Sequence, residues 1–160
     1  NVSPRQFRDP QFVDYVTQAV RDTGINPRGL KLELTEGLML DNIEETIGKM
    51  EALGKTGLSF CLDDFGTGYS SLSYLKRLPL SQIKIDQSFV RDIEVDANDA
   101  VLIRTIIGMA NNLNLGVIAE GVETEEQWQM LRAMGCSAYQ GFYFGRPAPA
   151  AELEALAAKP

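Results

Sequence analysis

The chain has 160 residues and a formal net charge of −7, from fifteen basic and twenty-two acidic side chains. This charge argues against a broad basic surface, so we expect no DNA or RNA polymer as a partner. No apolar run approaches the ~18 residues of a membrane span, and we expect no membrane contact from this segment. The chain has no histidine, which removes the commonest general base and the commonest zinc ligand together.

Cys61 and Cys136 lie in apolar segments and lack the spacing of a metal or redox motif. We expect buried, reduced thiols in a cytoplasmic protein. The sequence starts at Asn1 without a methionine, which suggests a fragment. Membrane tethering of a longer parent through other domains is left open.

Along the chain, segments in which apolar and polar residues alternate, as in strands, are separated by segments of helical periodicity. In chain order we expect a helix opened by Asp9 and Pro10 that ends at Gly24, a strand at 30–35, a helix with Asp41 and Glu44 in capping-box spacing, and a strand at 58–63. There follow a short helix stopped by Pro79, a strand at 82–86, a helix at 98–114, a strand at 116–120, a helix capped by Thr124 and Gln127, a strand at 138–142 and a terminal helix at 150–158.

This order predicts a parallel α/β fold. In most of the predicted strands large apolar residues alternate with polar or small ones, which favours a barrel over the continuous apolar strands of an open parallel sheet. A complete (β/α)8 barrel has eight strands and about 250 residues, whereas we count about five strands. Two architectures therefore stay open: an open sheet, or a barrel without its first units, which we favour.

Each predicted strand ends in a polar or ionisable residue. These residues are Glu33, Asp63 with Asp64, Lys84 with Asp86, Glu120, and Gln140. In parallel α/β folds such residues meet at the carboxyl edge of the sheet, where active sites and ligand-binding sites lie. Clustered carboxylates need a cation, and oxygen ligands without His or Cys select Mg²⁺ or Mn²⁺. The adjacent aspartates are suited to two ions about 3.5–4 Å apart.

Taken singly, these residues have ordinary explanations. Asp63 and Asp64 could cap a turn, Glu33 could be a solvated surface acid, and Lys84 a surface lysine. The recurrence at strand ends favours a shared site. Glycines 66 and 68 predict a mobile loop beside it.

The motifs NVS (1–3), ELTE (33–36), DDFGTGYSSL (63–72), KID (84–86), AEGVET (119–124) and QG (140–141) occur in this order. Together they resemble the EAL-domain family of cyclic-di-GMP phosphodiesterases. The resemblance runs from residue 1 to about residue 147.

The resemblance implies a (β/α)8 barrel that hydrolyses cyclic-di-GMP (c-di-GMP) to the linear dinucleotide pGpG with two Mg²⁺ or Mn²⁺ ions. It matches Asn1, Glu33 and Asp63 to a first metal site, Asp64 to a second, Glu120 to a metal-associated acid and general base, Lys84 to the lysine that holds the catalytic water, and Gln140 to the substrate site. It matches Glu36, and with it Glu123, to the anchoring of the loop 65–72, which the family uses in dimerisation.

The Glu-Ala-Leu signature of the family should precede residue 1, so residues 1–160 would be the C-terminal portion of such a domain. We expect the intact parent to be active and this piece alone to be weak or inactive. We also expect a homo-oligomer, formed through the loop 65–72 or through open sheet edges near 30–35 and 138–142. The alternative is an inactive c-di-GMP receptor or protein-docking module.

Overall fold

The computed structural model describes residues 1–39, 42–68 and 72–152. Within them, five parallel strands form one sheet in the order β1-β2-β3-β4-β5. The strands are β1 (Lys31–Thr35), β2 (Ser59–Phe65), β3 (Gln82–Ile85), β4 (Gly116–Ala119) and β5 (Ala138–Tyr139). Each strand pairs with the next in the sequence, as consecutive β-helix-β units require, and the predicted parallel α/β fold is confirmed.

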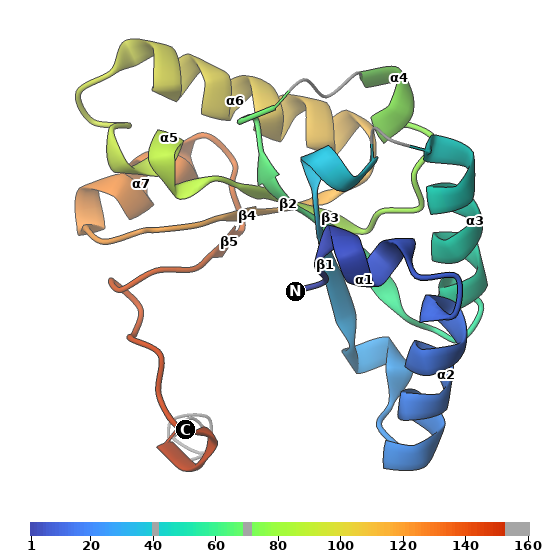
Figure 1. Ribbon diagram of the computed structural model, residues 1–160. Coiled ribbons are helices and arrows are strands. Elements are labelled where there is room, and N and C mark those ends of the chain that lie inside the picture. The colour runs from blue at the N-terminus through green and yellow to red at the C-terminus, as the bar shows by residue number, and fades with distance from the viewer. Residues whose placement is uncertain (40–41, 69–71, 153–160) are drawn as a thin grey trace.

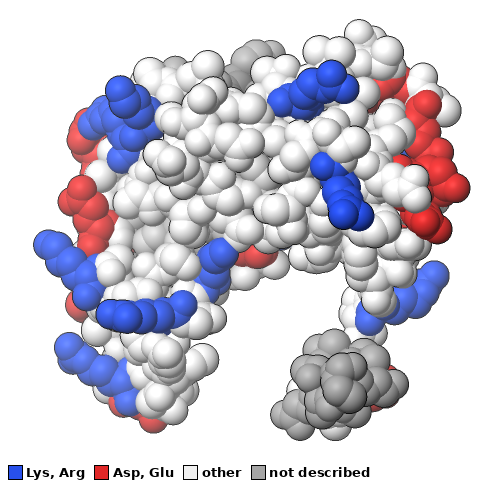
Figure 2. All heavy atoms as spheres, turned by 180° about the vertical axis from the view of Figure 1, so that it is seen from behind, with Lys and Arg blue, Asp and Glu red and all other residues white. Residues whose placement is uncertain are grey.

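The helices surround the outer face of this curved sheet (Figure 1). They are α1 (Pro4–Arg8), α2 (Phe12–Thr23), α3 (Ile43–Gly54), α4 (Leu72–Leu75), α5 (Gln87–Arg91), α6 (Ala97–Asn112) and α7 (Glu125–Ala133), with short 3₁₀ turns at Pro27–Gly29 and Glu36–Met39. Between β5 and β1 the wall is open, and the space-filling view from behind shows an arch with its opening on that side (Figure 2).

The two faces of the strands differ as the alternation predicts. Leu34, Phe60 and Ile83 are at most 1% exposed, within the core that the helices cover. Polar side chains occupy the other parity, where Lys31 donates a hydrogen bond to Gln82. Burial of the apolar side chains between the sheet and the helices thus stabilises the fold. The polar side chains lie on the inner face of the sheet.

Most element ends differ from the sequence prediction by one or two residues, and three of the differences concern α2, α3 and β5. Helix α2 begins at Phe12 with Gln11 as its N-cap and no side-chain cap bond; Asp9, two residues before the N-cap, accepts a hydrogen bond from the Gln11 backbone nitrogen. Helix α3 is capped by Asn42, and the predicted cap, Asp41, lies outside the described residues. Strand β5 ends at Tyr139, because the chain then turns to bond Val122 rather than continuing along β4.

Two short helices were not predicted. Helix α1 has a capping box between Ser3 and Gln6, with Pro4 at its first position, a signal that is readable in the sequence. Helix α5 is capped by Asp86, whose side chain accepts from the Ser88 backbone nitrogen. The predicted terminal helix at 150–158 lies outside the described residues from 153 on.

Two further expectations concern the cysteines and the membrane. Both cysteines are free and buried, as predicted, whereas the cytoplasmic location stays a prediction. Among the described helices, none combines the length and the apolar character needed to cross a bilayer.

Candidate metal and catalytic site

Asp63 and Asp64 reach the same rim because β2 is irregular at its end. The pairing with β3 shifts between Leu62 and Phe65, and Asp64 has a left-handed backbone with φ of 53°. In a regular strand, neighbouring side chains point to opposite faces. A bulge redirects one of them, and aspartate tolerates the left-handed region better than most residues.

Lys84 lies at the centre of the acidic residues. Its Nζ atom is 2.6 Å from Glu120 Oε1, 3.0 Å from Glu33 Oε2 and 3.0 Å from Asp63 Oδ1. The lysine side chain is 6% exposed, whereas the three carboxylates are 14–26% exposed. The contact between Lys84 Nζ and Asp63 Oδ1 is an ion pair without the alignment of a hydrogen bond. Asp63 Oδ1 can therefore accept a hydrogen bond or bind a cation. The sequence prediction that strand-end residues converge is therefore met for these four side chains.

Burial alone would lower the pKa of Lys84, but its contacts with Glu120, Asp63 and Glu33 outweigh burial and raise it. The ammonium therefore stays charged across the physiological pH range. Burial raises the pKa of Glu120 against the opposing effect of Lys84, and the nearby Asp63 charge adds to the rise. A carboxylate with a raised pKa is a better proton acceptor near neutral pH.

Asn1 joins the group from the edge of the sheet. The Val2 backbone nitrogen donates to the Glu33 carbonyl oxygen at 2.9 Å, which places the first residues along β1. One terminal atom of the Asn1 amide lies 2.9 Å from Glu33 Oε2 and 3.3 Å from Asp63 Oδ2. As a nitrogen it donates two hydrogen bonds; as an oxygen it supplies a neutral ligand to a cation.

Asp86 approaches Asp64 from the following strand. Burial raises the pKa of Asp64, and the neighbouring Asp63 and Asp86 carboxylates raise it further. The pKa of Asp86 is lowered because hydrogen bonds from Ser88 outweigh its burial. The sequence placed Asp86 at a strand end but gave it no role in the site.

The residues fit a hard divalent cation. Asp63, Asp64 and Glu120 each offer a carboxylate oxygen, and these three oxygens lie within 4.8 Å of one another. Carboxylate and amide oxygens are the ligands of Mg²⁺ and Mn²⁺ in proteins. Glu33 and Asn1 lie alongside these three residues, and metal binding by the five residues stays a prediction.

Glu36 contacts the loop that follows β2. Its Oε2 atom accepts a hydrogen bond from the Gly68 backbone nitrogen at 3.1 Å, and the carboxylate is buried. A Cβ atom at position 68 would lie 2.9 Å from the Glu36 carboxyl carbon, so glycine permits this approach. The contact agrees with an anchoring role for Glu36; residues 69–71 of the loop lie outside the described residues.

Gln140 and Glu123 border a groove rather than the acidic centre. A cavity of ≈ 230 Å³ is lined by Gln87, Glu120, Gly121, Glu123, Gln140, Gly141 and Phe142. An adjoining cavity of ≈ 240 Å³ shares Gln87, Gly121 and Glu123 with it. Gln140 is thus placed where a ligand bound at Glu120 would extend. The Glu123 side chain is exposed beside the same groove, and its predicted anchoring of the loop 65–72 stays a prediction.

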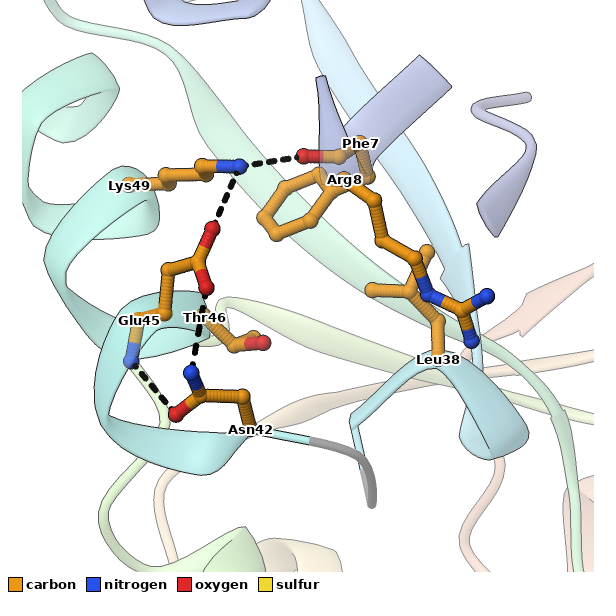
Figure 3. Close-up of a pocket in the computed structure, with 7 residues that line it drawn as sticks. All are labelled: Phe7, Arg8, Leu38, Asn42, Glu45, Thr46 and Lys49. Carbon is orange, nitrogen blue, oxygen red and sulfur yellow. Dashed lines mark hydrogen bonds and ion pairs between the residues drawn. The ribbon is translucent and has the colours of Figure 1, made fainter. Parts of the chain in front are cut away.

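A third cavity lies between α1 and α3 and is not part of this site (Figure 3). It is lined by residues such as Phe7 and Leu38, and Lys49 closes it with a 2.8 Å hydrogen bond to the Phe7 carbonyl oxygen. Its volume of ≈ 30 Å³ admits about one water molecule.

Acidic side chains are concentrated in the part of the chain that holds α5, α6 and the start of α7. Residues 87–126 contain eight acidic side chains and two arginines. Figure 2 shows acidic side chains at the end of the molecule that holds α5 and α7. Such a surface repels a nucleic-acid polymer.

Comparison with known proteins places these features in a family. The family model of the EAL domain matches residues 1–147. The chain belongs to the EAL domain family.

Two curated EAL relatives come from Pseudomonas aeruginosa. The bifunctional diguanylate cyclase/cyclic di-GMP phosphodiesterase MucR is 42% identical over 158 residues, 99% of this chain and 23% of its own length. The cyclic di-GMP phosphodiesterase NbdA is 47% identical over 143 residues, 89% of this chain and 18% of its own length. The chain therefore spans about a fifth of the length of these relatives.

Solved EAL structures share the fold. The MucR phosphodiesterase in complex with c-di-GMP superposes with a TM-score of 0.92 at 42% identity, over 96% of this chain and 62% of that one. The manganese/c-di-GMP complex of Klebsiella pneumoniae BlrP1 gives a TM-score of 0.81 at 32% identity, over 89% of this chain and 36% of that one. The five-stranded parallel sheet is thus an incomplete EAL barrel, and the fold prediction is confirmed.

Proposed function

We propose that residues 1–160 are the C-terminal portion of an EAL phosphodiesterase domain that hydrolyses c-di-GMP to linear pGpG with Mg²⁺ or Mn²⁺. The observation that carries the proposal is the convergence of Asp63, Asp64 and Glu120, whose carboxylate oxygens lie within 4.8 Å of one another, with Lys84 ion-paired to Asp63 and Glu120. The c-di-GMP complex of MucR and the phosphodiesterase names of MucR and NbdA support the choice of substrate.

Asn1, Glu33, Asp63, Asp64 and Glu120 would hold the ions. When bound, the ions polarise the phosphoryl oxygens and lower the pKa of bound water. In the reaction, water adds to one phosphorus, the bond from phosphorus to the 3′ oxygen breaks, and the leaving oxygen gains a proton. The product carries a 5′ phosphate and a free 3′ hydroxyl.

Two residues of the chain would handle the water. The raised pKa of Glu120 suits it to accept the proton that the water loses. The ammonium of Lys84, held by three carboxylates, is a fixed donor that orients the water and offsets negative charge on the phosphate. Gln140, on the groove beside Glu120, would contact the substrate away from the reacting phosphate.

Incubation of the parent protein with c-di-GMP and Mn²⁺ tests this proposal, with pGpG measured by chromatography. Glu120→Ala and Asp63→Asn should each abolish turnover. Tight binding of c-di-GMP by wild-type protein without turnover would instead support the receptor function. Turnover that survives both substitutions would contradict the assigned site.

The chain alone should be weak or inactive and should self-associate through the loop 65–72 or through the edges of β1 and β5. The β1 edge is occupied by the chain itself at one point, where Val2 bonds Glu33, so β5 is the more available edge. Light scattering of the isolated chain tests this, and a monodisperse monomer would count against it.

A further inference from the structure

Gln127, in α7, is a buried glutamine whose side-chain amide joins two elements. The residue is 6% exposed. Its amide oxygen accepts hydrogen bonds from the backbone nitrogens of Glu123, at 2.8 Å, and Thr124, at 3.2 Å. Its amide nitrogen donates to the Arg91 carbonyl oxygen, at 3.4 Å. The side chain thus ties the segment before α7 to the last residue of α5.

The segment before α7, residues 120–124, carries Glu120. The backbone nitrogen of Glu120 donates to the Ile85 carbonyl oxygen at 3.1 Å, and that of Val122 donates to the Gln140 carbonyl oxygen at 3.1 Å. The next two backbone nitrogens are those that Gln127 accepts from. Neighbouring strands therefore hold the first half of the segment, and one side chain holds the second half.

Helix α5 carries the carboxylate on the other side of the site. Asp86 caps its first turn and lies beside Asp64. Gly121 contacts this helix directly, since a Cβ atom at position 121 would lie 2.5 Å from Gln87 Cβ. The segment 120–124 thus touches α5 near its start through Gly121 and is bonded to its end through Gln127.

We propose that Gln127 is a positioning residue: by bonding the segment 120–124 to α5, it sets the separation between Glu120 and the Asp63–Asp64 pair. The inference rests on the proposed function, because that separation matters for catalysis only if the three carboxylates hold the ions. Replacing a residue that orients a metal ligand typically costs about 10–100-fold in metal affinity or activity.

A purely structural role makes a different prediction. Gln127 also forms a capping box with Thr124, and loss of a cap alone would lower the melting temperature. It would leave metal affinity and kcat unchanged at temperatures where the variant is folded. Metal affinity therefore separates the two roles.

Two substitutions and one control test the proposal in the parent protein. Gln127→Met keeps the side-chain length and removes all three hydrogen bonds. Gln127→Glu keeps an acceptor for the Glu123 and Thr124 nitrogens but cannot donate to Arg91. Gln129→Met is the control, because Gln129 lies on the exposed face of the same helix, where its amide bonds Glu125 at 3.0 Å.

Mn²⁺ affinity is measured by calorimetry without substrate, and kcat and KM for c-di-GMP are measured separately. For Gln127→Met we expect a loss of about 10–100-fold in Mn²⁺ affinity and in kcat, with KM changed by less than about threefold. Gln127→Glu should lie between this variant and the wild type, and Gln129→Met should match the wild type. In hydrogen exchange, the Glu123 and Thr124 amides should lose protection in Gln127→Met and keep it in Gln127→Glu.

Wild-type Mn²⁺ affinity and kcat in folded Gln127→Met, or an equal loss in Gln129→Met, would overturn the inference. If Gln127→Met does not fold, Gln127→Glu decides: affinity equal to the wild type overturns the inference, and a reduced affinity supports it. Wild-type protein that binds Mn²⁺ but does not hydrolyse c-di-GMP refutes the proposed function, while the Mn²⁺ affinities still test Gln127. Wild-type protein that binds no Mn²⁺ refutes both.

Discussion

Replacing Lys84 with methionine should destabilise the metal-free protein by about 3–5 kcal/mol at neutral pH. At an effective dielectric constant of about 20, a unit-charge pair at 3 Å attracts by roughly 5–6 kcal/mol. Lys84 makes three such contacts, at 2.6, 3.0 and 3.0 Å, against a cost of several kcal/mol for burying its own charge. The substitution leaves Glu33, Asp63 and Glu120 facing one another without a cation. Proton uptake by Glu120, whose pKa burial raises, limits the loss to the range measured for broken buried ion pairs.

The pH dependence of this loss has a definite sign. The folded pKa of Lys84 is raised, so its stabilisation is fully present below the unfolded pKa of about 10.4 and is lost as pH rises beyond it. As pH falls, Glu120, whose pKa is raised by burial, takes up a proton, and the shortest of the three ion pairs of Lys84 is lost. The difference between wild type and Lys84→Met should therefore be largest between about pH 6 and 9.

Urea denaturation in EDTA at pH 7 and pH 4 measures this difference. Lys55→Met, at an exposed position after α3, is the control and should change stability by less than about 0.5 kcal/mol. Mg²⁺ should stabilise Lys84→Met more than the wild type, because the ion replaces the missing charge. A loss below about 1 kcal/mol at pH 7, or one that is undiminished at pH 4, would refute the reasoning about the buried charges.

Three further predictions concern close contacts and a thiol. Gly68→Ala, whose Cβ would lie 2.9 Å from the Glu36 carboxyl carbon, should break the Glu36 bond and cost about 1–3 kcal/mol in denaturation; an unchanged midpoint would contradict this. Gly141→Ala would place a Cβ atom 2.1 Å from the Val122 carbonyl oxygen, so it should lower the melting temperature and slow turnover. A wild-type melting temperature and rate would contradict this, because they would show that the backbone at Val122 moves away at no cost. Burial raises the pKa of Cys61 to about 12, so iodoacetamide at pH 8 should spare it in the folded protein, and stability should fall as pH rises from about 9 toward 12, a slope that Cys61→Val should reduce.

The convergence of the acids could be predicted from the sequence because strand ends in parallel α/β folds meet at one edge. Lys84 and Glu120 follow this rule directly, since they lie at or just after the end of β3 and β4, whereas Glu33 lies in the middle of β1. The barrel prediction rested on the same alternation, and the side-chain parity of β1 to β3 agrees with it.

Other features depend on contacts that the sequence does not encode locally. The redirection of Asp64 requires the shifted pairing of β2 with β3, which strand periodicity does not reveal. Gln127 was recognisable as a capping residue, but its bond to Arg91 joins residues 36 positions apart. Helix α1 was predictable from Ser3 and Gln6 and was missed because five residues are too few for a periodic pattern.

The backbone of Asp64 affects how substitutions there should be interpreted. Asparagine keeps the shape of aspartate and tolerates a φ of 53°, so Asp64→Asn changes the charge alone. Alanine or valine would also disfavour that dihedral angle and would tend to return the end of β2 to a regular extension. Loss of activity in such variants would report a displaced Asp63 as much as a missing carboxylate.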